Sequence, residues 1–223
     1  MDSFIDGVRY LSDNIDVLVR GFRETLKLLA SSSILALVVG TIVAVARVAP
    51  VPIVRGLGSF YIAIFRNTPL LVLILLTYYG LPEIGINFGF FWNITLAMGL
   101  YTAAFVCEAV RSGLNGVPLG QAEAARAIGM PFSSTMRFVI LPQAFRLTIP
   151  PLASAFIALT KNTSLAASFG VAEATYRMRD MINVTPSQIW FTFGGVAAGY
   201  ILVVAVISAI ATFAERQTKA VKR

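Results

Sequence analysis

The sequence contains no histidine and only one cysteine among its 223 residues. Without histidine, acid–base catalysis by imidazole and histidine-ligated metal sites are excluded. The single cysteine, Cys107, cannot form a disulfide within the chain, and its position in an apolar run indicates a small, buried packing residue.

Groups that support catalysis or ATP hydrolysis are also missing. The sequence has no glycine-rich phosphate loop of the type G-x-x-x-x-G-K-[ST], so the chain is not expected to hydrolyse ATP itself. No cluster of cysteines and carboxylates offers a metal site, and no nucleophile with a nearby base can be identified. We therefore predict a chain with no catalytic residues, no metal and no cofactor of its own.

Charged residues are scarce, at 13% of the chain, whereas a soluble domain has about 25%. Hydrophobic residues make up 57% and the mean hydropathy is +0.78, which indicates a polytopic membrane protein. The net charge of +7 comes from basic residues between and beside hydrophobic segments. This distribution follows the positive-inside rule and does not form the soluble basic face that nucleic-acid binding needs.

Five hydrophobic segments each approach the ~20 residues that cross a bilayer core. We expect transmembrane helices over roughly 26–46, 57–81, 94–114, 141–159 and 190–213. The second is interrupted by Arg66-Asn67-Thr68-Pro69, where the proline removes a backbone donor and should kink the helix. The predicted fold is therefore an all-α polytopic membrane protein with five transmembrane helices.

The remaining segments complete the domain organisation. Residues 1–25 carry apolar side chains at helical spacing and four aspartates, Asp2, Asp6, Asp13 and Asp16. This pattern predicts an amphipathic helix in the membrane interface, or equally a leader into the first span, and it does not indicate a signal peptide. Residues 26–215 form the predicted transmembrane domain, and residues 216–223 form a basic tail.

Charges between the spans predict the orientation of the chain. With five spans, three basic segments share one side: the connection with Arg47 and Arg55, the connection at about 117–142, and the tail 216–223. The other side holds the acidic N-terminus, Glu83 and a mixed loop over 173–180. The positive-inside rule therefore places the N-terminus outside and the basic segments in the cytoplasm, with two arginines of the mixed loop as a minor exception.

The connection at 117–142 predicts a helix–turn–helix between the third and fourth spans. Pro118 suits the first turn of a helix, and Gly129 is placed to take the left-handed conformation that ends it. Pro131 prevents continuation, and Ser133 or Ser134 can cap a second short helix.

A few charged residues lie at membrane depth, where an unpaired Arg or Lys costs about 2.5–3.5 kcal/mol. The candidate pathway residues are these charges and nearby hydroxyls: Arg66, Thr68, Glu108, Arg111, Lys161, Thr163 and Ser164. Glu108 and Arg111 are three apart, so they share a helix face and can pair. Two interpretations stay open: a structural pair with Lys161 at the membrane edge, or a cavity for a charged or zwitterionic solute.

The connection also carries a family resemblance. Glu123-Ala124-Ala125, Gly129, Val139 and Leu141-Pro142 resemble the EAA loop of ABC importer permeases, which usually have isoleucine in place of Val139. Further motifs are similar to the branch that takes up polar amino acids. They are Arg66–Leu71, Tyr101–Glu108 with Arg111, Gly120-Gln121, Leu141–Ala144 and Lys161–Leu165.

This resemblance implies a type I ABC importer permease in the cell membrane. It implies an ABC ATPase dimer that uses ATP, a second permease chain (the same or homologous), and an extracellular solute-binding protein. The paired spans would alternate access, driven through the EAA loop. The implied coupling residues are Gly120, Glu123, Ala124, Ala125, Gly129, Leu141 and Pro142.

The sequence as a whole most resembles glutamate permeases of high-GC Gram-positive bacteria, so the finer prediction is uptake of glutamate or a close relative. A stand-alone secondary carrier or channel is the main alternative, although five spans without internal symmetry argue against a complete pathway in one chain. A membrane enzyme is a weaker alternative, because no reactive constellation is present.

Overall fold

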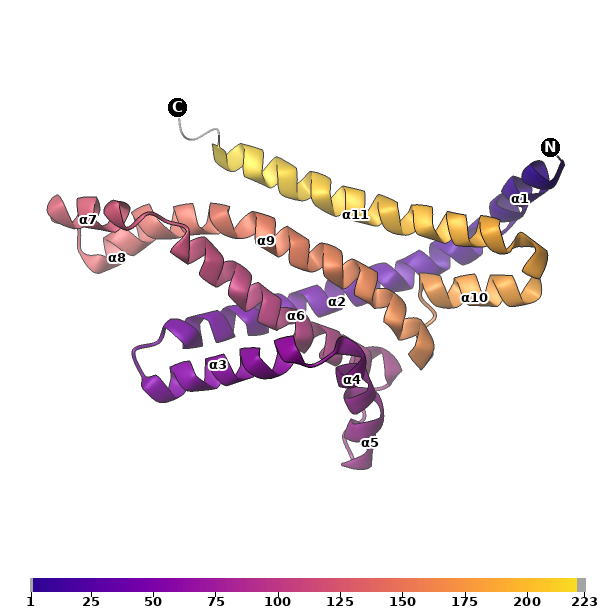
Figure 1. The fold of residues 1–223 in the computed structure, drawn as a ribbon, viewed down its shortest axis with the longest axis horizontal. Coiled ribbons are helices and arrows are strands. Elements are labelled where there is room, and N and C mark those ends of the chain that lie inside the picture. The colour runs from indigo at the N-terminus through magenta and orange to yellow at the C-terminus, as the bar shows by residue number, and fades with distance from the viewer. Residues whose placement is uncertain (1, 220–223) are drawn as a thin grey trace. The chain divides into compact units, whose positions relative to one another are not determined.

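The structure is a computed structural model that describes residues 2–219. Over these residues every regular element is helical and none is a strand, which confirms the predicted all-α class (Figure 1). Lys222 and Arg223 of the predicted basic tail lie outside the described residues.

Four helical stretches are long and apolar enough to span a membrane: Ile15–Val48, Phe90–Asn115, Phe132–Phe169 and Pro186–Gln217. A fifth span is present if the bent pair Pro52–Asn67 and Leu70–Glu83 counts as one crossing. The first of these spans is followed, in chain order, by α3 (Pro52–Asn67), α4 (Leu70–Leu75), the π-helical η1 (Leu76–Gly80), α5 (Leu81–Glu83), α6 (Phe90–Asn115), α7 (Leu119–Ala127), α8 (Phe132–Ser134), the π-helical η2 (Thr135–Ile140), α9 (Leu141–Asn162), the 3-10 helix η3 (Thr163–Phe169), α10 (Ala174–Val184), the 3-10 helix η4 (Pro186–Gln188) and α11 (Ile189–Lys219). Of these, α7 and α10 lie in connections between the spans.

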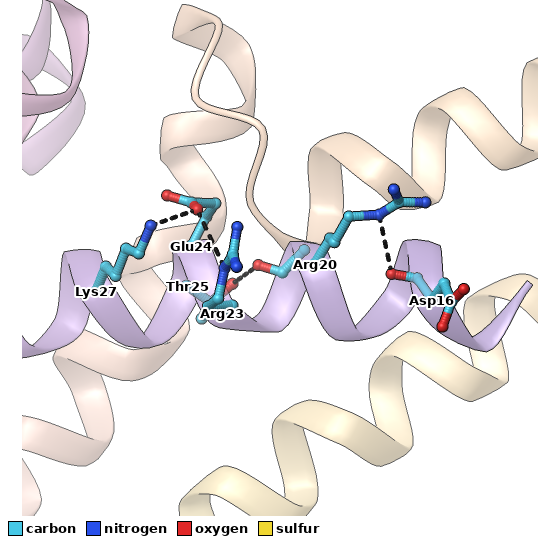
Figure 2. A network of polar contacts seen from close by, with 7 residues as sticks. Asp16, Arg20, Arg23, Glu24, Thr25 and Lys27 are labelled. Carbon is cyan, nitrogen blue, oxygen red and sulfur yellow. Dashed lines mark hydrogen bonds and ion pairs between the residues drawn. The ribbon is translucent and has the colours of Figure 1, made fainter.

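The N-terminal segment forms α1 (Asp2–Asp13), and α2 (Ile15–Val48) follows after the single residue Asn14. The first span therefore begins as a helix well before residue 26. The polar first turns of α2 are stabilised by local contacts such as Lys27 Nζ with Glu24 Oε1 at 2.8 Å (Figure 2). The interfacial placement of residues 1–25 stays a prediction.

The second predicted span is broken rather than kinked. Thr68 and Pro69 are extended, with φ/ψ of −97°/129° and −58°/134°, so α3 ends at Asn67 and α4 starts at Leu70. The missing N–H of Pro69 and its steric effect on Thr68 explain the break, because the residue before a proline disfavours the helical region.

The fourth span begins earlier than predicted, because helix runs from Phe132 through Pro142 to Phe169. Pro142 is accommodated by η2, in which Leu141 N–H donates to Met136 O, five residues back. Pro142 has no N–H to donate to a carbonyl of the preceding turn, and the wider π-helical turn accommodates this missing hydrogen bond.

The chain divides into two compact units. Unit 1 comprises Met1–Leu35, Pro69–Gly99 and Ile157–Val206, and unit 2 comprises Ala36–Thr68, Leu100–Phe156 and Ile207–Arg223. The chain changes unit five times, once within each predicted span. All segments predicted to face the cytoplasm belong to unit 2 and all those predicted outside belong to unit 1. This grouping agrees with five crossings and with α3 and α4 as one broken span, while the side assigned to each unit stays a prediction.

Each unit has its own apolar core. In unit 2, Val43 and Ala44 of α2 pack with Ile62 of α3 and with Ala104 and Cys107 of α6. Cys107 has no exposed surface, which confirms that it is a buried packing residue. One apolar cluster of unit 1 is formed by four residues from α2, α10 and α11: Leu18, Ala174, Met181 and Val196.

Small residues allow the helices of unit 1 to approach closely. A Cβ on Gly195 of α11 would lie 3.0 Å from Leu11 of α1, and a Cβ on Gly199 would meet the ring of Phe22 on α2. The ring of Phe4 also packs edge-on against Phe191, with centroids 5.7 Å apart. Part of the apolar face of α1 is therefore covered by α11.

Candidate coupling hairpin and charged cluster

The predicted helix–turn–helix is present in unit 2 as α7 followed by α8, η2 and α9. Gly129 ends α7 in the left-handed conformation, with φ of +81°. Its N–H donates to Arg126 O at 2.9 Å, and the N–H of Met130 donates to Ala125 O at 3.1 Å. These two bonds form a Schellman motif, which satisfies the last carbonyls of α7. The predicted left-handed end of α7 at Gly129 is confirmed.

The predicted helix starts need correction. Pro118 is the N-cap residue of α7, with ψ of 134°, and not its first helical residue. Ser133 and Ser134 do not cap the second helix, because both lie inside α8 and no side chain caps its start. Pro131 takes the extended N-cap conformation instead, with ψ of 159°, so the helix already begins at Phe132.

Hydrogen bonds and close packing hold the hairpin together. Gln143 Nε2 of α9 donates to Gln121 Oε1 of α7 at 3.4 Å, and also to Val139 O at 2.8 Å. Where α6 leads into the hairpin, a Cβ on Gly113 would lie 2.6 Å from Ala144 O of α9. The backbones of α6 and α9 are thus nearly in contact beside the hairpin.

The hairpin leaves large apolar side chains uncovered. Leu119, Ile128 and Phe132 are 82%, 79% and 80% exposed. Of the predicted coupling residues, Ala125 is 5% exposed and packs inward, whereas Glu123 points its charge at solvent. The remaining five are also exposed: Gly120, Ala124, Gly129, Leu141 and Pro142.

The membrane-depth charges of unit 2 centre on Glu108 of α6. Arg111 Nη2 donates to Glu108 Oε2 at 3.3 Å, which confirms the predicted pair. The structure adds Arg47 of α2, whose Nη1 donates to Glu108 Oε1. From the sequence, Arg47 is predicted only to mark the cytoplasmic side of the membrane. Because Arg47 and Glu108 are 61 residues apart, no local spacing signals their contact.

We call Arg47, Glu108 and Arg111 the arginine cluster. The side chains of Arg47 and Glu108 are 17% and 24% exposed, and that of Arg111 is 43% exposed. Gly58 of α3 packs against the stem of Arg47, since a Cβ there would lie 2.7 Å from Arg47 Cγ. Two guanidinium groups share one carboxylate, so the cluster carries one excess positive charge. Arg111 Nε is buried without a hydrogen-bond partner among the described residues.

The other predicted pathway residues are placed as follows. In unit 2, Arg66 is exposed with its guanidinium 5.6 Å from the centre of the Phe105 ring, and Thr68 lies at the break after α3. In unit 1, Lys161 is exposed and the Ser164 hydroxyl donates to Lys161 O at 2.7 Å. The Thr163 side chain is fully buried and donates to Thr160 O at 2.6 Å.

Glu173 does not lie in the mixed loop that its polar neighbours predict. It has no exposed surface and caps the N-terminus of α10. Its Oε1 accepts from Tyr176 N–H at 2.9 Å, and its Oε2 accepts from the Tyr200 hydroxyl at 2.7 Å and the Thr25 hydroxyl at 3.3 Å. Burial raises the pKa of Glu173, although these donors oppose that shift.

The chain combines four candidate membrane spans, or five if the bent pair counts as one, with an exposed apolar hairpin that follows α6. Residues 36–220 match the family described as binding-protein-dependent transport system inner membrane component. The chain belongs to this family.

Curated relatives narrow the class. The chain is 40% identical over 200 residues to the glutamate transport system permease protein GluC of Corynebacterium glutamicum, covering 83% of this chain and 86% of GluC. It is 32% identical to the glutamate/aspartate import permease protein GltJ of Escherichia coli, covering 89% and 86%. It is 35% identical to the probable glutamine ABC transporter permease protein GlnM of Bacillus subtilis, covering 94% and 97%.

The fold agrees with these relatives. The crystal structure of an amino acid ABC transporter with histidines superposes with a TM-score of 0.85 at 30% identity, covering 93% of this chain and 96% of that chain. The type I ABC importer permease fold is thereby confirmed. The chain is the permease component of an amino acid ABC importer, a multi-pass protein of the cell membrane.

Proposed function

We propose that this permease imports glutamate or a close acidic relative. The observation that carries the proposal is the arginine cluster, in which two guanidinium groups share the single carboxylate of Glu108. An acidic amino acid brings a second carboxylate, which forms strong, charge-assisted hydrogen bonds with guanidinium groups. The names of GluC and GltJ support the same substrate class.

The other pathway residues complete the proposal. Arg66 and Lys161 add positive charge along the route, while Thr68, Thr163 and Ser164 offer neutral hydrogen bonds. Glu108 either holds the two arginines in place or contacts the amino group of the solute.

Import is driven by ATP through alternating access, with hydrolysis on a separate ABC ATPase dimer. The hairpin is the docking element, because Leu119, Ile128 and Phe132 expose apolar anchors next to the charged Glu123. A second permease chain, the same or homologous, completes the pathway, and an extracellular solute-binding protein delivers the amino acid.

The test is reconstitution of the chain in vesicles with its co-expressed ATPase and binding protein. Glutamate should stimulate ATP hydrolysis and accumulate only when ATP is present, whereas arginine should do neither. Stimulation by glutamine but not glutamate would overturn the substrate. Uptake without the ATPase would overturn the importer mechanism and favour a stand-alone carrier.

A further inference from the structure

The buried carboxylate of Glu173 joins three helices of unit 1. It caps α10 through Tyr176 N–H, accepts from Tyr200 of α11, and accepts from Thr25 of α2. Thr25 is itself fully buried, and its hydroxyl oxygen accepts from Ala174 N–H at 3.1 Å. Figure 2 shows Thr25 among the polar residues of α2.

Capping alone does not explain this arrangement. An N-cap side chain needs only to accept from a backbone N–H of the first turn, and exposed serine, threonine or aspartate serve this purpose. Glu173 places its second oxygen against two hydroxyl groups from other helices, at the cost of full burial. The side chain therefore ties α10 to α2 and α11.

The Tyr200 hydroxyl also lies 3.3 Å from Thr175 Oγ1, so α11 is bonded to α10 at a further point. Helix α10 is in turn bonded to η3, since Arg179 Nη2 of α10 donates to Ser168 Oγ of η3 at 3.3 Å. The helix η3 is thus held by α10, which Glu173 and Tyr200 fix to α2 and α11.

We infer that Glu173 is a positioning residue for transport. By fixing α10, which is bonded to η3, it holds η3 so that Lys161 and Ser164 keep the orientation in which they meet the amino acid. This inference rests on the proposed role of Lys161 and Ser164 in the pathway, and Glu173 itself does not contact the solute.

The test uses the reconstituted complex with radiolabelled glutamate and compares solute moved per ATP hydrolysed. Glu173→Gln keeps an oxygen for Tyr176 N–H, but the NH2 group that replaces Oε2 is only a donor, so it accepts from neither the Tyr200 nor the Thr25 hydroxyl. Solute moved per ATP should fall roughly tenfold, the factor that one hydrogen bond to a charged group represents. The ATPase rate with loaded binding protein should stay within about twofold, because the hairpin is untouched.

Two further variants separate positioning from simple stabilisation. Tyr200→Phe removes only the linking hydroxyl and should lower solute per ATP in the same way. The double variant Glu173→Gln with Tyr200→Phe should be no worse than the more damaging single variant, since both changes break one link. Asp180→Asn on the same helix is the control, because its carboxylate is 46% exposed and pairs with Arg177 at 3.5 Å. It should match wild type.

Several outcomes would overturn the inference. Wild-type solute per ATP in Tyr200→Phe would do so even if Glu173→Gln failed to fold. Equal losses of transport and ATP hydrolysis, with a lower melting temperature, would reduce Glu173 to a helix cap. If the wild-type complex transports another amino acid, the same ratio is measured with that one, so a wrong substrate does not affect this test.

Discussion

Replacing Glu108 with glutamine should destabilise the protein by leaving two arginines without their carboxylate. Removing one partner of a fully buried ion pair costs about 3–5 kcal/mol. Because Glu108 is 24% exposed and Arg111 43% exposed, solvent screens part of this loss, and we expect about 2 kcal/mol. For a chain of this size that corresponds to a fall in melting temperature of roughly 4–8 °C.

The arginine cluster also predicts which second change restores stability. Arg47 is 17% exposed and packs against α3, whereas Arg111 is 43% exposed and can turn towards water. In the Glu108→Gln background, Arg47→Gln should therefore recover more of the lost stability than Arg111→Gln, because it removes the more buried orphaned charge. Both should recover some of it.

Thermal unfolding of the purified complex is the assay, measured beside transport selectivity. Glu83→Gln is the matched control, since Glu83 is an exposed carboxylate. A Glu108→Gln variant that melts with wild type, or a better recovery from Arg111→Gln, would refute the reasoning. Altered selectivity between glutamate and glutamine at unchanged stability would instead assign Glu108 to solute recognition.

Three further predictions concern coupling, topology and pH. Gly129→Val should strain a residue that needs positive φ by roughly 1–3 kcal/mol, whereas Glu123→Lys should leave stability unchanged. Both variants should insert into the membrane normally and lose solute-stimulated ATP hydrolysis. If both variants couple ATP hydrolysis to solute as the wild type does, the hairpin is not part of the mechanism. Cysteine tags at Ser3 and Lys222, in a Cys107→Ser background, should label from opposite sides of the membrane, and labelling from one side would contradict five spans. Because the pKa of Glu173 is raised in the folded protein, its contribution to stability is present at acidic pH and is lost as the pH rises through that pKa. Glu173→Gln should therefore make the melting temperature depend less on pH. An unchanged pH dependence of the melting temperature would contradict this prediction.

Local signals in the sequence predicted the parts of the fold that local physics controls. Gly129 ends α7 as expected, because a glycine after helix-forming residues adopts positive φ without strain. Hydrophobic length accounts for four of the five predicted spans, and the other is the bent pair of α3 with α4 and α5. The serine cap failed because Pro131 already sets the extended conformation before the helix, which leaves no N-cap position for Ser133 or Ser134.

Contacts between distant helices could not be predicted. Arg47 and Glu108 meet only because α2 and α6 pack in a particular register, and no spacing in the chain encodes that register. Glu173 stands among polar residues, so its sequence context resembles an exposed loop. Its burial depends on Thr25 and Tyr200, which lie 148 positions before it and 27 positions after it.

The geometry of the hairpin separates the residues of the EAA-like motif by what each one does. Gly129 closes α7 through positive φ, Ala125 is small enough to pack inward, and Pro142 follows the π-helical segment that joins the hairpin to the fourth span. These residues shape the hairpin. Glu123 has an exposed, charged side chain and a position on α7 that none of these shaping roles requires. A change at Glu123 should therefore act on the partner contact, and changes at the other three should act first on the hairpin itself.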